Sequence, residues 1–366
     1  MIFLINISIF ANMIKNNYKV IGVMSGTSLD GIDLIYASFE LNNTWSFNII
    51  KAETIPYSNV WKTTLKSLVS LSFEEIKKID KSYTTYLASV IKDFINANHI
   101  QDIDAVCSHG HTALHQPDKG LTYQIGNREA LSKLLKQRVV CDFRVQDVEL
   151  GGQGAPLVPI GDELLFSEFD FCINFGGFAN ISTHINNQRI AYDICPVNIV
   201  MNHYVKTLGL EYDDEGKLAS KGDVNYELLQ SLNALDFYNE KPPKSLGLEW
   251  VNSHVFPLID SKALEVKDVL RTFVEHVAIQ VFRSLGDKPK GSVLITGGGA
   301  YNSFLIKRIK ELTQNKIVIP LDELVEFKEA LIFCFLGILR LRNENNCLQS
   351  VTGASRNHSS GKIFHA

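Results

Sequence analysis

Two kinds of hydrophobic pattern alternate along the chain and predict a mixed α/β protein. Near the start, the apolar runs VIGVMS (20–25), DLIYASFEL (33–41) and SFNIIKAETIPY (46–57) are typical of neighbouring strands. Residues 61–97 instead carry apolar positions at helical spacing, with polar faces between them. The segment IDAVCSHGH (103–111) predicts a strand that ends in a polar loop, and residues 129–145 predict a helix followed by another strand.

The same alternation begins again near residue 171. FCINFGGFANIS (171–182) and QRIAYDI (188–194) predict strands around glycine turns, and helical patterns follow at 197–209 and 266–286, before the apolar strand SVLITGG (292–298). We therefore predict an α/β protein with a first domain at residues 18–170 and a second at 171–366. Residues 1–17 are interpreted as a dispensable N-terminal extension.

Composition and charge narrow the class of protein. The formal net charge of the 366 residues is only -4, which predicts neither a nucleic-acid-binding surface nor a polybasic membrane patch. The six cysteines show no CxxC spacing, so we interpret them as reduced packing residues of a cytoplasmic enzyme: Cys107, Cys141, Cys172, Cys195, Cys334 and Cys347. The apolar start MIFLINISIFA is too short to span a bilayer; a weak signal peptide is the alternative interpretation.

Glycine-framed turns recur at three places. SGTSLDG, between the first two predicted strands, places backbone and hydroxyl groups where phosphate oxygens could bind, and Asp30 and Asp33 could orient a metal-bound water. An ordinary hairpin is the alternative for this loop alone. Similar turns open the second half and follow its late strand, which suits a nucleotide held between two domains. The residues predicted to bind nucleotide are Gly26, Thr27, Ser28, Asp30, Gly31, Gly176, Gly177, Asn180, Gly297, Gly298, Gly299 and Asn302.

Seven motifs together carry a resemblance to a known family. They are GVMSGTSLDGID (22–33), HGHTALHQP (109–117), YQIGN (123–127), DFRVQDVELGGQGAPLVP (142–159), NFGGFANIS (174–182), TGGGAYN (296–302) and SVTGAS (350–355). In this order they resemble the anhydro-N-acetylmuramic acid kinase family of bacterial cell-wall recycling. The resemblance implies an actin-like fold, in which two ribonuclease H-like domains flank a cleft for nucleotide and sugar.

The resemblance also implies a reaction. ATP, Mg²⁺ and water convert 1,6-anhydro-N-acetylmuramic acid into N-acetylmuramic acid 6-phosphate and ADP. The implied partner is a small-molecule sugar, without nucleic acid or membrane, and the metal ligands and a homodimeric state are left open. Because O6 of this sugar is bridged to C1, water must attack C1 while a base takes its proton, and the released O6 can then attack the γ-phosphoryl group.

Two aspartates flank Arg144 in CDFRVQDVELGGQGAP and are the candidate bases. The resemblance favours Asp147 as the catalytic base, whereas Asp142 at the strand end is interpreted as structural. A pair of solvated turn carboxylates around Arg144 is the alternative. Arg144 could hold the lactyl carboxylate of the sugar or form a structural ion pair. The remaining predicted sugar-binding residues are His111, Gly152, Gln153 and Gly154.

The three histidines of HGHTALHQP lack the carboxylate spacing of a metal site. The resemblance implies that this segment lies at the sugar cleft, which would place His109, His111 and His115 at or behind the sugar site; packed, hydrogen-bonded histidines at a strand end are the alternative. The chain also departs from the family pattern. Ile194, Cys195, Pro196 and Val197 stand within a motif that is commonly DTGPGN, and Asn127 and Asn202 replace aspartates. Two alternatives stay open: a kinase of the same fold for another amino sugar, and a non-catalytic actin-like ATPase.

Overall fold

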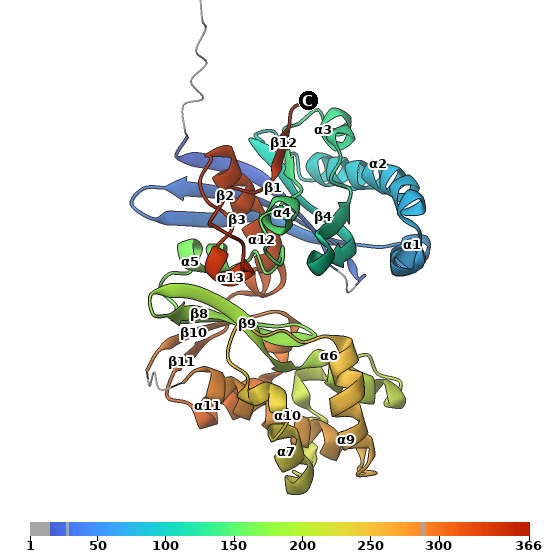
Figure 1. The fold of residues 1–366 in the computed structure, drawn as a ribbon, viewed down its shortest axis with the longest axis vertical. Helices are drawn as coiled ribbons and strands as arrows, with labels where there is room; N and C mark the ends of the chain where they lie inside the picture. Colours follow the sequence, from blue (N-terminus) through green and yellow to red (C-terminus); the bar gives the residue numbers. More distant parts are fainter. Residues whose placement is uncertain (1–14, 27–28, 287–289) are drawn as a thin grey trace, which may run out of the picture.

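The structure is a computed structural model that describes residues 15–26, 29–286 and 290–366. Thr27 and Ser28 of the predicted nucleotide loop therefore lie outside the described residues. Two α/β units lie one above the other, and each is built on its own sheet (Figure 1).

The first sheet has three antiparallel strands followed by parallel ones. Its order is β12-β6-β4-β1-β2-β3, with β5 paired to β4. Strands β1 to β3 pair antiparallel, β4 and β6 continue the sheet in parallel beside β1, and β12 closes the edge antiparallel to β6. The bounds are β1 (Asn17–Ser25), β2 (Gly31–Leu41), β3 (Trp45–Pro56), β4 (Ala105–Gln116), β5 (Leu121–Ile125), β6 (Val139–Cys141) and β12 (Lys362–Phe364).

The second sheet repeats this topology in the order β11-β10-β7-β8-β9. Strands β7 to β9 pair antiparallel, and β10 and β11 follow in parallel beside β7. Their bounds are β7 (Phe171–Phe175), β8 (Phe178–Ile185), β9 (Gln188–Pro196), β10 (Ser292–Thr296) and β11 (Lys316–Val318). The repeated topology is the expected actin-like arrangement, and the predicted fold class is confirmed.

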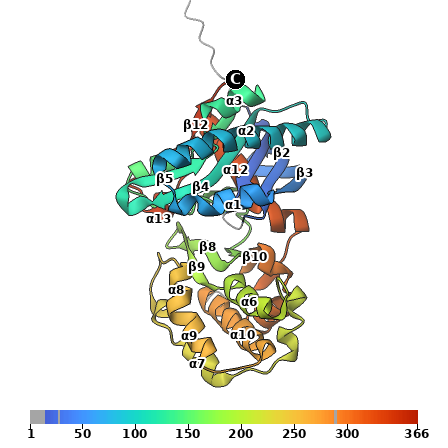
Figure 2. The same ribbon diagram turned by 90° about the vertical axis from the view of Figure 1, so that its right-hand side faces the viewer.

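Helices cover the sheets. In the first unit, α1 (Asn59–Ser67) and α2 (Phe73–Ala97) lie across one face of the sheet (Figure 2). Helix α2 begins with a capping box: the Ser72 hydroxyl accepts from the backbone N–H of Glu75, whose carboxylate accepts from the backbone N–H of Ser72. The other helices are α3 (Glu129–Leu135), α4 (Val145–Glu149), α5 (Pro159–Leu165), α6 (Asn198–Val205), α7 (Tyr226–Asn233), α8 (Leu248–Trp250), α9 (Phe256–Asp260), α10 (Val266–Ser284), α11 (Ser303–Leu312), α12 (Asp322–Leu341) and α13 (Gln349–Thr352).

Helix α12 packs on the first sheet although it follows the second in sequence. A Cβ added to Gly22 of β1 would lie 2.4 Å from the carbonyl oxygen of Ala330, so only glycine permits this close approach. Strand β12 likewise pairs with β6. The predicted second domain, 171–366, therefore needs a correction at its C-terminal end, because α12 and β12 belong to the first unit.

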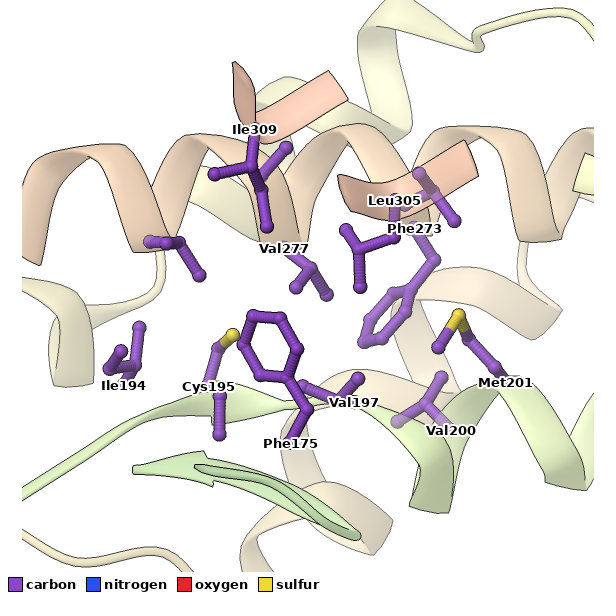
Figure 3. Packing of buried hydrophobic residues seen from close by; sticks show 14 of the residues in the cluster. Phe175, Ile194, Cys195, Val197, Val200, Met201, Phe273, Val277, Leu305 and Ile309 are labelled. Carbon is purple, nitrogen blue, oxygen red and sulfur yellow. The ribbon is translucent and has the colours of Figure 1, made fainter. Parts of the chain in front are cut away.

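The core of the second unit lies between its sheet and helices α10 and α11. Figure 3 shows Phe175, Cys195 and Val197 on the sheet side, facing Val277 and the residues of α11. Ile194, Cys195 and Val197 are each at most 2% exposed. The larger residues that replace the family's glycines thus fill the core, which explains how the chain accommodates them.

Candidate functional site

Asp147 is buried in a network that begins at helix α4. Its exposed fraction is 0%. Oδ2 accepts the backbone N–H of Gly154 at 2.7 Å, and Oδ1 accepts the Thr352 hydroxyl at 2.7 Å. A Cβ on Gly152 would lie 2.2 Å from Oδ2, so the GGQG segment wraps closely around the carboxylate. Both carboxylate oxygens thus accept a hydrogen bond from the surrounding protein.

Asp142 has a different environment. It directly follows β6, lies in the left-handed region with φ of 62°, and pairs with Lys362 of β12 at 2.6 Å. Because Asp147 is buried and Asp142 pairs with Lys362, the alternative of two solvated carboxylates around Arg144 does not describe this site.

Arg144 links strand β4 to the glycine-rich segment. Its Nε donates to Nε2 of His109 at 2.9 Å, and its Nη1 donates to the carbonyl oxygen of Gly154 at 2.6 Å. Since Nε2 of His109 accepts, its proton lies on Nδ1, which donates to the carbonyl oxygen of Gly110 at 2.8 Å. Burial, together with the charge of Arg144, holds the pKa of His109 well below its usual range. His109 therefore holds Arg144 as a neutral acceptor.

His111 connects β4 to the end of β1. Its Nδ1 lies 2.9 Å from the Ser25 hydroxyl, which is 2.6 Å from the Tyr57 hydroxyl, which in turn is 2.7 Å from that of Tyr83. Burial lowers the pKa of His111 to about 4. The segment expected to be a polar loop is in fact part of β4, because HTALHQ pairs with β5. A neutral His111 thus anchors the base of the predicted phosphate loop.

The second-unit turns meet at the carboxyl ends of two adjacent parallel strands, β7 and β10. Gly297 has φ of 81°, and a Cβ there would lie 2.6 Å from Oδ1 of Asn174. A Cβ on Gly298 would meet nothing within 4 Å, and one on Gly176 would meet only ordinary contacts at 3.5 Å or more. The turns of Gly176 and Gly298 therefore leave room for a ligand beside exposed backbone.

Other predicted nucleotide residues have structural partners. Oδ1 of Asn302 caps α11 by accepting the backbone N–H of Leu305 at 3.0 Å. Gly31 lies within β2, where a Cβ would be 2.5 Å from the carbonyl oxygen of Ile55 in β3. Strand packing is thus sufficient to explain Gly31. Asn180 is exposed on β8, and Gly299 is buried against Phe175.

Acidic residues of α12, which the sequence did not single out, face the first loop. The pKa of Asp33 is raised by burial and also by the charges of Asp30 and Glu326. Glu329 remains reachable by water, yet the surrounding protein raises its pKa, and the charges of Arg144 and Asp33 also act on it. The charges that act on Glu329 thus come from both motifs, through Arg144 and Asp33. Its signal in the sequence was an acidic residue within a long apolar helix.

Thr352 and His358 were also missed. SVTGAS was recognised as a motif without a role, although Thr352 lies beside Asp147. Nε2 of His358 lies 3.5 Å from Oδ1 of Asp147. Only the pairing of distant segments brings these residues to the site, so local patterns could not place them.

Asp193 and Asn198 remain from the motif that this chain otherwise replaces. Oδ2 of Asp193 accepts the backbone N–H of Leu246 at 2.8 Å, so it holds the segment that follows α7. Burial raises the pKa of Asp193. These contacts give Asp193 a structural role in the described residues.

Comparisons with known proteins point to one family. The family model described as anhydro-N-acetylmuramic acid kinase matches residues 18–366. The anhydro-N-acetylmuramic acid kinase of Zymomonas mobilis subsp. mobilis is 32% identical over 94% of this chain and 99% of its own length. The enzyme of that name from Pseudomonas syringae pv. tomato is 32% identical over 96% of this chain and 100% of its own length.

Solved structures are more distant. A xylulose kinase from Lactobacillus acidophilus has a TM-score of 0.46 and 11% identity, over 95% of this chain and 94% of that chain. A ROK family glucokinase from Streptomyces griseus, in complex with glucose and AMPPNP, has a TM-score of 0.41 and 12% identity, over 87% of this chain and 99% of that chain. Within the described part of the chain, no helix is both long and apolar enough to cross a membrane.

Proposed function

The chain belongs to the anhydro-N-acetylmuramic acid kinase family, and we propose that it performs this family's reaction with Asp147 as the base. The substrate is 1,6-anhydro-N-acetylmuramic acid, and the product is N-acetylmuramic acid 6-phosphate. The assignment of Asp147 rests on the hydrogen bonds that hold its carboxylate near Arg144. The Gly154 N–H donates to one oxygen, and the Thr352 hydroxyl donates to the other.

The proposed step opens the bridge and transfers the phosphoryl group in one sequence. Water attacks C1, its proton passes to Asp147, and the C1–O6 electron pair moves to O6. O6 then attacks the γ-phosphorus of ATP, and ADP leaves. One carboxylate near C1 thus starts both events.

Access to Asp147 requires a local movement. Because Asp147 is fully buried, water reaches it only after the segment 151–155 has shifted. Gly151 is exposed and has φ of 81°, so the segment begins at a residue with little steric restraint. We propose that the bound sugar displaces segment 151–155. An oxygen of the sugar then accepts the hydrogen bond that the Gly154 N–H otherwise donates to Asp147. Such coupling keeps the base away from solvent until the substrate is bound.

The nucleotide fits the open turns of the second unit. Gly176, Gly177 and Gly298 have no close neighbour where a Cβ would point, so their backbone can approach phosphate oxygens. Asp30 and Asp33 supply the carboxylate oxygens that Mg²⁺ prefers. When bound, Mg²⁺ would neutralise charge on the transferred phosphoryl group. The dependence on Mg²⁺, a cytoplasmic location and a homodimeric state are parts of this proposal.

Arg144 is proposed to position the sugar. Its Nε and Nη1 donate to His109 and Gly154, which fixes the guanidinium plane and leaves the N–H groups of Nη2 for the lactyl carboxylate. Gln153, in the segment that covers Asp147, is exposed. His111 acts behind this site by holding Ser25 at the start of the first loop.

An isotope experiment tests the reaction. The protein is incubated with ATP, Mg²⁺ and the anhydro sugar in ¹⁸O water, and the product is analysed by mass spectrometry. We expect label at C1 and none in the phosphate; unlabelled product in the same water corrects for exchange at C1. Label in the phosphate would mean that water attacks ATP, and the proposal would fail. A parallel assay with reducing amino sugars separates this function from that of an ordinary sugar kinase.

A further inference from the structure

We propose that Asp147, Cys347 and His358 form a binding site for a thiophilic divalent cation such as Zn²⁺. One ligand atom from each residue lies within 4.8 Å of the other two, and all three residues are buried. A carboxylate oxygen, a cysteine sulfur and an imidazole nitrogen are a ligand set that Zn²⁺ uses in proteins.

The backbone directs Cys347 and His358 to one side. The two residues form an antiparallel bridge, in which each backbone N–H donates to the other's carbonyl oxygen, at 3.1 and 3.2 Å. Side chains at directly opposed positions of an antiparallel pair project to the same face. The carboxylate of Asp147 lies on that face, since its Oδ1 is 3.5 Å from Nε2 of His358.

The nitrogen of His358 that faces Asp147 has no hydrogen-bond partner. Its Nδ1 lies 3.1 Å from the carbonyl oxygen of Arg356, so Nδ1 is the protonated nitrogen in the neutral ring. Nε2 is buried and unpartnered, and it lies 3.5 Å from Oδ1 of Asp147. A cation between these two acceptors would satisfy both. Two ligand atoms about 2.1 Å from one ion in tetrahedral geometry are about 3.4 Å apart, close to the separation found here.

The surroundings support the same interpretation. Zinc-binding histidines commonly donate their other ring N–H to a carbonyl or carboxylate, as His358 does to Arg356. The Thr352 hydroxyl fixes the orientation of Oδ1 of Asp147. Sulfur and imidazole ligands select a softer ion than Mg²⁺, which prefers oxygen. The site therefore differs from the Mg²⁺ site proposed for catalysis.

An ion bound here would inhibit the kinase. Bound to Oδ1, the cation would withdraw electron density from the carboxylate, so that Oδ2, which the shift of segment 151–155 exposes, would be a weaker acceptor for the proton of water. This inhibition rests on the proposed function, whereas binding of the ion does not.

Cobalt provides a direct test of binding. The full chain is freed of metal with a chelator and titrated with Co²⁺, and thiolate-to-cobalt charge transfer is followed in the absorption spectrum. We expect one Co²⁺ per chain with a charge-transfer band, and its displacement by Zn²⁺ but not by Mg²⁺. Cys347→Ser should abolish the band, and His358→Gln should weaken binding by at least about tenfold. Cys195→Ser, at a buried cysteine of the second unit, should keep the band.

The result does not depend on activity. No charge-transfer band in the wild-type protein, or a band that survives in folded Cys347→Ser, would overturn the proposed site. If a variant fails to fold, as judged by circular dichroism, X-ray absorption of the zinc-loaded wild-type protein decides the question. One sulfur ligand supports the site, and a first shell of oxygen and nitrogen alone refutes it. Zinc binding without loss of kinase turnover would instead contradict the role of Asp147 as base.

Discussion

The hydroxyl of Thr352 donates to Oδ1 of Asp147 at 2.7 Å, although 205 residues separate them in the sequence. The backbone strengthens this contact, because the carbonyl oxygen of Thr352 accepts the N–H of Gln153 at 2.8 Å. The C-terminal SVTGAS motif thus supports both the proposed base and the segment that covers it. The motif also contacts the second unit, because the Ser350 hydroxyl donates to the carbonyl oxygen of Arg189 in β9 at 2.6 Å.

Thr352→Val should slow the enzyme and destabilise the fold. Valine keeps the shape but removes a donor to a buried carboxylate, and such a hydrogen bond contributes about 1.5–3 kcal/mol. We expect a lower melting temperature and a fall in kcat with little change in KM for the sugar, since Asp147 loses its orientation. Thr352→Ser, which retains the hydroxyl, should recover most of the rate. Equal damage from both substitutions would show that packing of the methyl group is what matters.

Gly298→Ala should weaken nucleotide binding without unfolding the protein. A Cβ there meets nothing within 4 Å, so the fold tolerates it, but the methyl group would occupy the space proposed for the nucleotide. We expect the Kd for nucleotide, measured by calorimetry, to rise at least about tenfold, or about 1.4 kcal/mol. The Kd for the sugar should stay unchanged.

Gly297→Ala provides the contrast for this measurement. Its φ of 81° and the short distance to Asn174 predict a destabilised fold, with a lower melting temperature. If Gly298→Ala changes nucleotide affinity less than about twofold, this turn only connects neighbouring elements and does not bind the nucleotide.

Local patterns predicted the elements of this fold well. Apolar runs correctly predicted β1 to β3 and β7 to β9, because strand alternation and glycine turns depend only on residues that are neighbours in the sequence. The polar residues of HTALHQ, 111–116, are the exception at β4. They read as a loop, yet strand pairing with β5 accommodates them, and His111 is buried against Ser25.

Local sequence patterns could not predict contacts between segments that are distant along the chain. Nothing near Lys362 indicates that its strand pairs with β6, and so the second domain was predicted to extend to residue 366. The motif containing Asp147 was found, but its burial was not, because that depends on Thr352 and the wrapped glycine segment. Site residues within motifs were therefore accessible to prediction, whereas their supporting partners were not.

The buried histidine of the first unit predicts a loss of stability in mild acid. Burial lowers the pKa of His111 to about 4, whereas an unfolded histidine titrates near 6.5. Between these values the unfolded chain binds the proton and the folded protein does not, so the free energy of unfolding falls as the pH drops from about 6.5 to about 4. The contribution is present in full above this window. One such group gives a slope of up to about 1.4 kcal/mol per pH unit.

Urea unfolding at several pH values measures this slope. His111→Gln removes the titrating ring, so its free energy of unfolding should depend less steeply on pH than that of the wild-type protein between about 4 and 6.5. His109 remains in both proteins and cancels in the difference. Parallel curves for the two proteins would mean that His111 does not stay neutral in the folded state.

Asp147→Asn gives the sharpest test of the proposed mechanism. The amide retains the shape and can still accept the Gly154 N–H while its NH₂ group faces the Thr352 oxygen, so the fold should persist. It cannot accept a proton from water. Loss of a general base costs about 10² to 10⁴ in rate, and bridge opening and phosphorylation should disappear together, since O6 becomes a nucleophile only as the C1 bond breaks. Binding of the sugar should change little.

Asp142→Asn is the matched control for this prediction. Asp142 is 12% exposed and pairs with Lys362, which is 61% exposed, so water screens the lysine end of this ion pair, and an asparagine amide oxygen can still accept from the lysine. We expect a slightly lower melting temperature and a nearly normal turnover, measured by coupled ADP release. A dead but folded Asp142→Asn beside an active Asp147→Asn would move the base to the first aspartate. A variant at Asp147 that opens the ring without phosphorylating it would show that two different groups run the two steps.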